Sequence, residues 1–385
     1  MSATPSLNVP PYGRWSLADL TPSLLSAAGV SGQGNSLELD PCRGFCLVLI
    51  DGLGHEQLLQ HRDVAPFLAQ AAERKQPLAA GFPSTTSASL ASLGTGLPPG
   101  GHGLVGYTIA IPGHDRPMNT LLWELYGIGP HVELQTELVP EKFQPNPTVF
   151  ERAADAGMAV VTVGPPAHEG SPLTRAIFRG GEFRGAYFFD EVRAVIADAM
   201  GEERPAVYAY HPDLDTTGHV HGAGSDPWRE QLGRFDALIE GVATDLPDGC
   251  VLVVTGDHGM IRLEDKIDVA DEPRLMDGVR LMAGDARARQ LHVAPGAEQA
   301  VIDTWQEVLG ERGQVVPREE AVESGWFGQS VSDAARGRIG DVIAAFRSAV
   351  GVVQRDVDPL YASLTSHHGS MTSAEQLVPF VEVRS

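Results

Sequence analysis

Cysteine and lysine are both scarce in this chain of 385 residues, and no long apolar run is present. The three cysteines, Cys42, Cys46 and Cys250, are an odd number, and two of them fall in or beside apolar segments. We therefore expect free thiols in a reducing cytoplasm rather than a disulfide framework. No apolar run approaches the roughly 20 residues that span a bilayer. The amino terminus also lacks a cationic region followed by an apolar one, so no signal peptide is expected.

Positive charge is in short supply as well. The formal net charge is −22, which argues against binding to duplex nucleic acid or to an anionic membrane through a basic face. A small phosphate-bearing substrate such as a nucleotide is compatible with this charge, because bound divalent ions reverse the local field.

Acidic and histidine side chains follow apolar segments that have the pattern of buried strands, and this happens four times. The segments and the residues after them are Phe45–Ile50 with Asp51, Val207–Tyr210 with Asp213, Asp215 and His219, Cys250–Val254 with Asp257 and His258, and Leu364–Thr365 with His367 and His368. A lone aspartate after a strand is usually a turn residue or a helix cap. Four such clusters favour a metal centre, at the strand ends where open α/β sheets bind their ligands. Carboxylates and imidazoles without thiolates suit zinc or manganese.

Strands and helices alternate from Phe45 onward, which predicts an α/β fold with a mostly parallel central sheet covered by helices on both faces. We expect helices over 147–156, 190–200 and 227–243, the last with Asp226 as N-cap, and further strands over 159–163 and 205–210. Because the four clusters span the sequence, residues 1–385 are expected to form a single domain. Residues 1–40 are expected to wrap its surface. The charge-rich segment 262–345 is either an inserted cap that shapes the pocket or a peripheral subdomain.

Four hydroxyl side chains follow Pro83 and precede a run of small residues that suits a tightly packed helix. They are Ser84, Thr85, Thr86 and Ser87. A hydroxyl at a helix start is usually a cap, but it also lies at the positive end of the helix dipole and can act as a metal-activated nucleophile. The residues alone leave all four as candidates.

The order of these motifs resembles the alkaline phosphatase superfamily, and most of all its nucleotide pyrophosphatase/phosphodiesterase branch. The resemblance extends from residue 45 to about residue 380. It implies a nucleophile nine residues before the threonine of the Thr95-Gly96 pair, which is Thr86. It also implies two metal ions, one held by Asp51, Thr86, Asp257 and His258 and the other by Asp215, His219 and His368. In this pattern Asp215 is preferred over Asp213, and His368 over His367.

The resemblance further implies a two-metal hydrolase of nucleotide phosphodiester or pyrophosphate bonds, with a phosphothreonine intermediate. Tyr210 matches an aromatic residue that stacks on a base in similar enzymes, although a core tyrosine is an equal alternative. Ser89 stands where the branch commonly has an asparagine that contacts a phosphoryl oxygen, so that contact is weakened or made by another group. The chain resembles actinobacterial enzymes that convert cyclic di-AMP through a linear dinucleotide to AMP. The alternatives are a phosphomonoesterase, a phosphonate hydrolase, or an inactive nucleotide-binding sensor.

Overall fold

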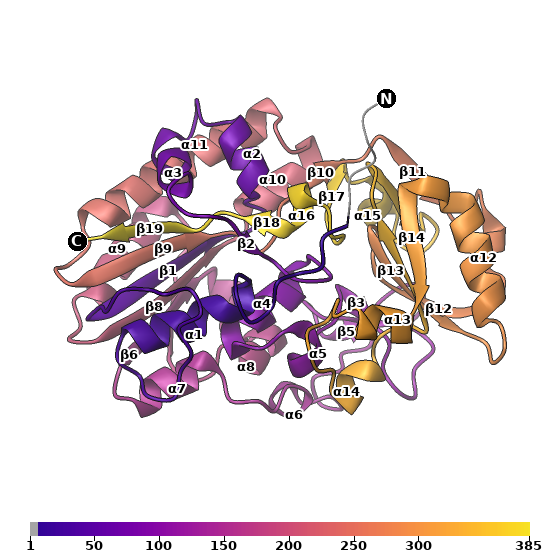
Figure 1. Cartoon of the computed structure of the whole chain (residues 1–385), viewed down its shortest axis with the longest axis horizontal. Helices are drawn as coiled ribbons and strands as arrows, with labels where there is room; N and C mark the ends of the chain where they lie inside the picture. Colours follow the sequence, from indigo (N-terminus) through magenta and orange to yellow (C-terminus); the bar gives the residue numbers. More distant parts are fainter. Residues whose placement is uncertain (1–6) are drawn as a thin grey trace.

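The computed structural model describes residues 7–385, and its centre is a six-stranded sheet (Figure 1). The strand order is β19-β9-β1-β8-β6-β7. The bounds are β1 Gly44–Ile50, β6 Ala159–Gly164, β7 Glu182–Gly185, β8 Pro205–His211, β9 Cys250–Thr255 and β19 Val381–Arg384. Neighbouring strands are parallel except for β19, which runs antiparallel to β9 at one edge. The predicted mostly parallel α/β sheet is confirmed.

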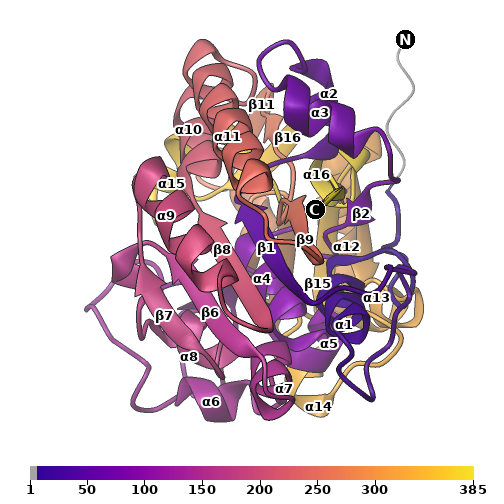
Figure 2. The ribbon, with the colours of Figure 1, turned by 90° about the vertical axis from the view of Figure 1, so that its left-hand side faces the viewer.

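Helices cover both faces of this sheet (Figure 2). Alternate side chains of β1 point to opposite faces, as the two-residue period of a strand requires, so Phe45, Leu47 and Leu49 belong to one core and Cys46, Val48 and Ile50 to the other. Helices α1 (Leu17–Ala27), α4 (Thr86–Thr95), α7 (Val149–Asp155) and α8 (Pro172–Ile177) pack on the first core. Helices α2 (His55–Gln60), α3 (Pro66–Ala72), α9 (Phe189–Met200), α10 (Asp213–His221) and α11 (Asp226–Thr244) pack on the second.

The predicted strands and the three predicted helices are present, with ends that shift by no more than two residues. Two predictions were wrong. The N-cap of α11 is Ser225, and Asp226 is already helical. Of the segment 1–40, residues 1–6 lie outside the described residues, and residues 7–40 do more than wrap the surface, because α1 buries Leu17, Leu20 and Leu24 completely. Their spacing of three and four residues builds an apolar helix face despite the polar composition around them.

A second, antiparallel sheet lies beside the first and falls within the segment predicted as an insertion (Figure 1). Its order is β12-β13-β15-β14, with bounds β12 Val279–Asp285, β13 Ala288–Val293, β14 Gly313–Pro317 and β15 Val342–Phe346. Helix α12 (Glu298–Leu309) packs on it through the fully buried Trp305, and together they have a hydrophobic core of their own. The parallel pair β11 (Asp265–Asp268) and β16 (Val350–Val353) adjoins this region. Its role as a cap stays a prediction.

Short elements complete the chain. The strands are β2 Leu78–Ala79, β3 Thr108–Ile109, β4 Met118–Asn119, β5 Glu124–Leu125, β10 Ile261–Arg262, β17 Ser366–His367 and β18 Leu377–Val378. The helices are α5 Pro99–His102, α6 Pro140–Phe143, α13 Arg318–Glu323, α14 Asp333–Arg336, α15 Pro359–Ser363 and α16 Ser373–Gln376, with 3-10 turns η1 Pro166–His168, η2 Pro273–Met276 and η3 Gly310–Arg312. Within residues 7–385, none of the helices combines the length and the apolarity needed to cross a bilayer.

Candidate metal centre

Three adjacent strands, β9, β1 and β8, end at the same edge of the central sheet, and each is followed by an aspartate. Asp51 directly follows β1, Asp257 comes two residues after β9, and Asp215 lies in the first turn of α10 after β8. Gly52 allows them to meet. It has a left-handed φ of 74°, its N–H donates to Asp257 Oδ1 at 2.9 Å, and a Cβ there would lie 2.9 Å from the Asp215 Cα.

The three carboxylates each keep one buried oxygen without a hydrogen-bond partner among the described residues. These atoms are Asp51 Oδ1, Asp215 Oδ1 and Asp257 Oδ2. Burial raises the pKa of Asp51 well above its ordinary value, and the charges of Asp257 and Asp215 raise it further. Burial also raises the pKa of Asp215. Carboxylates buried this close together need positive charge beside them, and the unpartnered oxygens are the atoms that a cation would bind.

Three histidines point their Nε2 atoms toward these carboxylates and their Nδ1 atoms toward backbone carbonyls. The Nδ1 atoms of His219, His258 and His368 lie 2.7, 3.1 and 2.9 Å from the backbone oxygens of Ser366, Gly259 and Ser84. Since a carbonyl can only accept, each Nδ1 carries the proton and each Nε2 offers a lone pair. That arrangement is typical of histidines that bind metals.

The Nε2 atoms lie close to the carboxylate oxygens. His258 Nε2 is 3.3 Å from Asp257 Oδ2 and 3.6 Å from Asp51 Oδ1. His219 Nε2 is 3.4 Å from Asp215 Oδ2, and His368 Nε2 is 4.0 Å from Asp215 Oδ1.

Two groups of possible ligands emerge in the described chain, each with its ligand atoms within 4.8 Å of one another. One contains Asp51, Asp257 and His258, and the other contains Asp215, His258 and His368. His258 belongs to both because its ring stacks on that of His368, with the centroids 3.5 Å apart. His219 adjoins the second group through its contact with Asp215, and the centroid of its ring lies 5.2 Å from that of His368. The predicted division of ligands between two ions stays a prediction.

Of the four hydroxyls after Pro83, only Thr86 faces this centre. Ser84 donates to the Ser370 carbonyl at 2.7 Å, Thr85 to Asp285 Oδ1 at 2.8 Å and Ser87 to the Gly106 carbonyl at 3.1 Å, and all three are buried. Thr86 is the first residue of α4, and its Oγ1 lies 3.2 Å from His258 Nε2.

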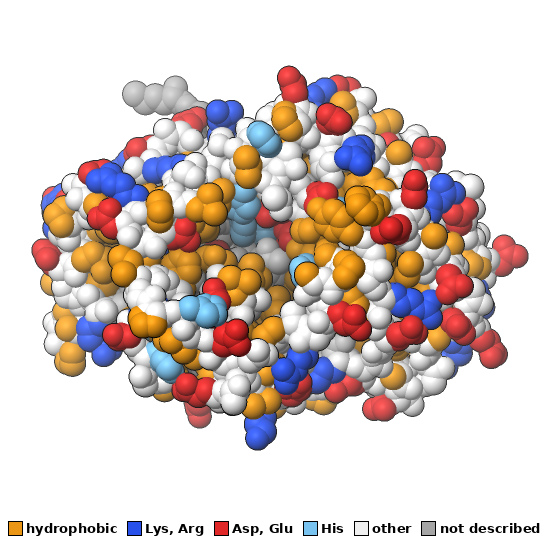
Figure 3. Space-filling view, turned by 180° about the vertical axis from the view of Figure 1, so that it is seen from behind, with side chains coloured by type: hydrophobic (Ala, Val, Ile, Leu, Met, Phe, Trp, Pro, Cys, Tyr) orange, Lys and Arg blue, Asp and Glu red, His pale blue; other side chains and the backbone are white. Residues whose placement is uncertain are grey.

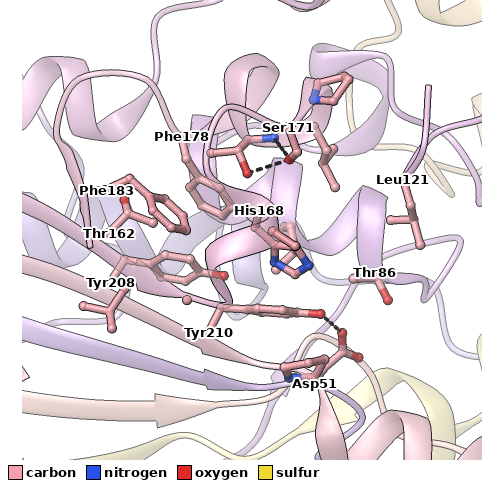
Figure 4. Close-up of a pocket in the computed structure, with 18 of the residues that line it drawn as sticks. Asp51, Thr86, Leu121, Thr162, His168, Ser171, Phe178, Phe183, Tyr208 and Tyr210 are labelled. Carbon is pink, nitrogen blue, oxygen red and sulfur yellow. Dashed lines mark hydrogen bonds between the residues drawn. The ribbon is translucent and has the colours of Figure 1, made fainter. Parts of the chain in front are cut away.

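A pocket of about 530 Å³ opens beside the centre, with Asp51, Thr86 and Asp215 among its lining residues. Its walls are mainly apolar and aromatic: Leu90, Leu121, Leu122, His168, Leu173, Phe178, Phe183, Tyr208 and Tyr210. Figure 4 shows the rings of Tyr208, Tyr210, Phe178 and Phe183 gathered at one end, with Thr86 and Leu121 at the other. From outside, histidine side chains are visible in a hollow in the middle of the surface (Figure 3). A flat apolar group attached to a phosphate would fit such a site.

Residues 45–371 match the model of the type I phosphodiesterase/nucleotide pyrophosphatase family. The chain belongs to this family. The family is named for the hydrolysis of phosphodiester and pyrophosphate bonds, so the family and the hydrolase activity that the resemblance implied are confirmed. No curated protein is similar enough in sequence to be matched with the chain.

Solved structures share the fold of this phosphodiesterase family member. Murine ectonucleotide pyrophosphatase/phosphodiesterase 5 has a TM-score of 0.65 at 16% identity, covering 89% of this chain and 88% of its own. An inactive threonine-to-alanine variant of that murine protein, in complex with AMP, has a TM-score of 0.63 at 16% identity, covering 88% and 87%. Phosphonoacetate hydrolase from Sinorhizobium meliloti, in complex with phosphonoacetate, has a TM-score of 0.63 at 19% identity, covering 89% and 90%.

Most of the predicted site residues come together, and the structure separates the close alternatives. Asp213 accepts a hydrogen bond from the Tyr187 hydroxyl at 2.7 Å instead of facing the centre. His367 is fully buried in β17, which pairs with β10 outside the central sheet, so this last cluster does not follow a strand of that sheet. Ser89 is buried, its hydroxyl has no hydrogen-bond partner among the described residues, and it is not among the residues that line the pocket, so a contact with the phosphoryl group stays a prediction. Tyr210 lines the pocket and is only half-buried.

Several residues around the phosphodiesterase site were not predicted from the sequence. Phe178 directly follows α8, and Phe183 lies in β7. Leu121 and Leu122 come from the loop after β4. Asp285, at the end of β12, reaches from the second sheet to the neighbour of Thr86. Aromatic residues after a short helix carry no pattern of their own. The only available signal was their position near strands that end in aspartates.

Proposed function

We propose that this enzyme cleaves phosphodiester or pyrophosphate bonds of nucleotides at a two-metal centre, with Thr86 as the nucleophile. The observation that carries the proposal is the position of the Thr86 hydroxyl at the metal centre. Its three neighbours donate to groups elsewhere in the protein, while Thr86 Oγ1 lies beside His258 at the start of α4. A sensor that only bound a nucleotide would have no need of such a hydroxyl.

The residues fit a pair of divalent cations, as the three unpartnered carboxylate oxygens indicate. In this proposal Asp51, Thr86, Asp257 and His258 hold one ion, and Asp215, His219 and His368 hold the other. Carboxylate, hydroxyl and imidazole donors suit zinc or manganese. The bound ions would neutralise charge on the phosphoryl group and lower the pKa of the nucleophilic hydroxyl.

Thr86 performs the first chemical step. Its Oγ1 forms a bond to phosphorus, the bond from phosphorus to the leaving oxygen breaks, and the proton of the hydroxyl passes to solvent water. Water then attacks this phosphothreonine, which still carries its nucleoside, and the bond from phosphorus to Oγ1 breaks. A nucleoside monophosphate leaves, and Oγ1 regains a proton. The first N–H groups of α4 have no acceptor within the helix and can bind a non-bridging phosphoryl oxygen.

The aromatic pocket supports a nucleotide as the substrate. A nucleobase would fill an apolar space walled by tyrosine and phenylalanine rings, whereas phosphonoacetate has no such group to place there. The neighbour with AMP and an inactivating threonine replacement supports both the ligand class and the nucleophile. Within this class we propose cyclic di-AMP and linear dinucleotides, converted to AMP. The three free thiols support a reducing cytoplasm as the setting.

The test is a panel of substrates with the full chain in manganese or zinc. It contains cyclic di-AMP, linear dinucleotides, nucleoside pyrophosphates, p-nitrophenyl mono- and diesters, and phosphonoacetate. We expect nucleotide substrates to be cleaved fastest and activity to vanish after chelation and return with metal. Full activity in metal-free protein would refute the two-metal centre. Faster cleavage of phosphonoacetate or of the monoester would identify one of the alternatives, and AMP binding without any turnover would identify a sensor.

A further inference from the structure

Tyr210 belongs to both halves of the site. Its ring is a wall of the aromatic pocket, and its hydroxyl donates to Asp51 Oδ2 at 2.5 Å (Figure 4). Asp51 is 3% exposed, so solvent contributes little to its hydrogen bonding in this arrangement. The bond occupies one carboxylate oxygen and leaves the other, Oδ1, without a partner and 3.6 Å from His258 Nε2.

The different use of the two Asp51 oxygens matters because Asp51 lies among other carboxylates. Asp257 offers a carboxylate oxygen within 4.8 Å of one on Asp51, and among the described residues the Tyr210 hydroxyl is the side-chain donor to Asp51. Without this bond, the Asp51 carboxyl would be free to rotate away from its neighbours. A hydrogen bond from a rigid ring fixes its orientation before a cation arrives.

We propose that Tyr210 is a positioning residue for the metal centre, which holds the Asp51 carboxylate so that Oδ1 is presented to the cation. The same ring carries the base of the substrate, so one side chain joins nucleotide recognition to metal binding. The inference rests on the proposed function in one respect, namely that Asp51 is a metal ligand.

The chain offers a matched control two residues earlier on the same strand. Tyr208 also lines the pocket and is 1% exposed, but its hydroxyl has no hydrogen-bond partner within residues 7–385. Replacement of either tyrosine by phenylalanine removes one oxygen atom and keeps the ring. Only the change at 210 removes a bond to a proposed ligand.

The experiment measures manganese and zinc affinity of the metal-stripped full chain by calorimetry, without nucleotide, for the wild type and for Tyr210→Phe, Tyr208→Phe, Asp51→Asn and the double variant Asp51→Asn/Tyr210→Phe. We expect Tyr210→Phe to weaken metal binding at the site that contains Asp51 by about 10- to 100-fold. Tyr208→Phe should leave it within about twofold. In the Asp51→Asn background the Tyr210 change should have no further effect, because the tyrosine acts only through that carboxylate. At saturating metal, Tyr210→Phe should still bind AMP, since the ring remains.

The outcomes separate the two proposals. If Asp51→Asn keeps its metal affinity, the ligand assignment in the proposed function fails. If Asp51→Asn loses affinity while Tyr210→Phe stays within about twofold of the wild type, only the positioning role fails. An equal loss in Tyr208→Phe, or an undiminished effect of the tyrosine change in the double variant, would show a general packing effect and would also overturn the inference. Should Tyr210→Phe not fold, the hydroxyl would be a structural requirement and the positioning role would likewise be rejected.

Discussion

The metal centre and the aromatic pocket share Asp51, Thr86 and Asp215 but are built in different ways. The centre draws its side chains from widely separated parts of the chain and fixes each histidine with a hydrogen bond to a backbone carbonyl. The pocket takes most of its walls from residues 162–183 and holds them by apolar packing. We therefore expect changes in the centre to abolish the reaction, and changes in the pocket only to alter the relative rates on different substrates.

The largest effect is expected for Thr86→Ala. The variant loses the attacking oxygen but keeps three of the four proposed ligands of that ion, so metal should still bind. Turnover should fall at least about 1,000-fold, equivalent to ~4 kcal/mol of transition-state stabilisation. Rates are compared at saturating metal, and phosphate trapped from a quenched reaction should map to the Thr86 peptide in the wild type only. Turnover within about tenfold of the wild type would instead favour direct attack by water.

A loss of roughly 100-fold is expected for Asp257→Asn, which keeps the shape of the side chain but removes a charge from the centre. Metal content and turnover should fall together while the melting temperature does not drop. Elemental analysis of the dialysed protein gives the first quantity. Unchanged metal content would mean that this aspartate is not a ligand.

A smaller and selective effect is expected for Phe183→Ala in the pocket. Phe183 lies on the edge strand β7 and is only half-buried, so its removal should cost little stability. The KM for nucleotide substrates should rise by about tenfold, or ~1.4 kcal/mol of lost stacking, while hydrolysis of bis-p-nitrophenyl phosphate changes less. Phe188→Ala is the control, because Phe188 is 68% exposed and does not line this pocket. Equal losses on both substrates would contradict the view that the pocket acts only on the choice of substrate.

The smallest effect on rate is expected for Thr85→Ala, one residue from the nucleophile. Its hydroxyl donates to the buried Asp285 of the second sheet, so the variant should lose about 1–3 kcal/mol of stability. Turnover should stay within a few-fold of the wild type, because Thr85 does not face the centre. Thermal unfolding and steady-state rates on one preparation give both numbers. A rate loss as large as that of Thr86→Ala would mean that the second sheet positions the nucleophile.

The centre was more predictable than the pocket for a physical reason. Asp51, Asp215 and Asp257 each follow a strand of one parallel sheet, and the ends of such strands converge, so local pattern implied spatial proximity. The choice of nucleophile among the four hydroxyls could not be made from the residues alone. It depends on partners as remote as Ser370 and Asp285, which only the folded chain brings to Ser84 and Thr85.

The fold, too, was predictable only where a local sequence pattern marks the element. Buried strands such as β1 and β9 are recognisable in the sequence as apolar runs, and their alternation with helices predicted a mostly parallel sheet. The order of the strands in that sheet was not predicted. Helix α1 was missed because the composition of residues 1–40 concealed the spacing of its leucines. The walls of the pocket were missed because Phe178 and Phe183 owe their position to tertiary packing, and no local period marks them.

The hydrogen bond between His368 and the Ser84 carbonyl also constrains the order of assembly. It ties the segment that holds the nucleophile to one of the last segments of the described chain, and Asp51 and His368 stand near opposite ends of that chain. A nascent chain that has not yet delivered residue 368 therefore lacks a complete centre, however well its first strands have paired. During synthesis, metal binding would therefore occur only after the segment with His368 has folded against the segment with Asp51. The free energy of binding stabilises only the state in which all of these segments are in contact.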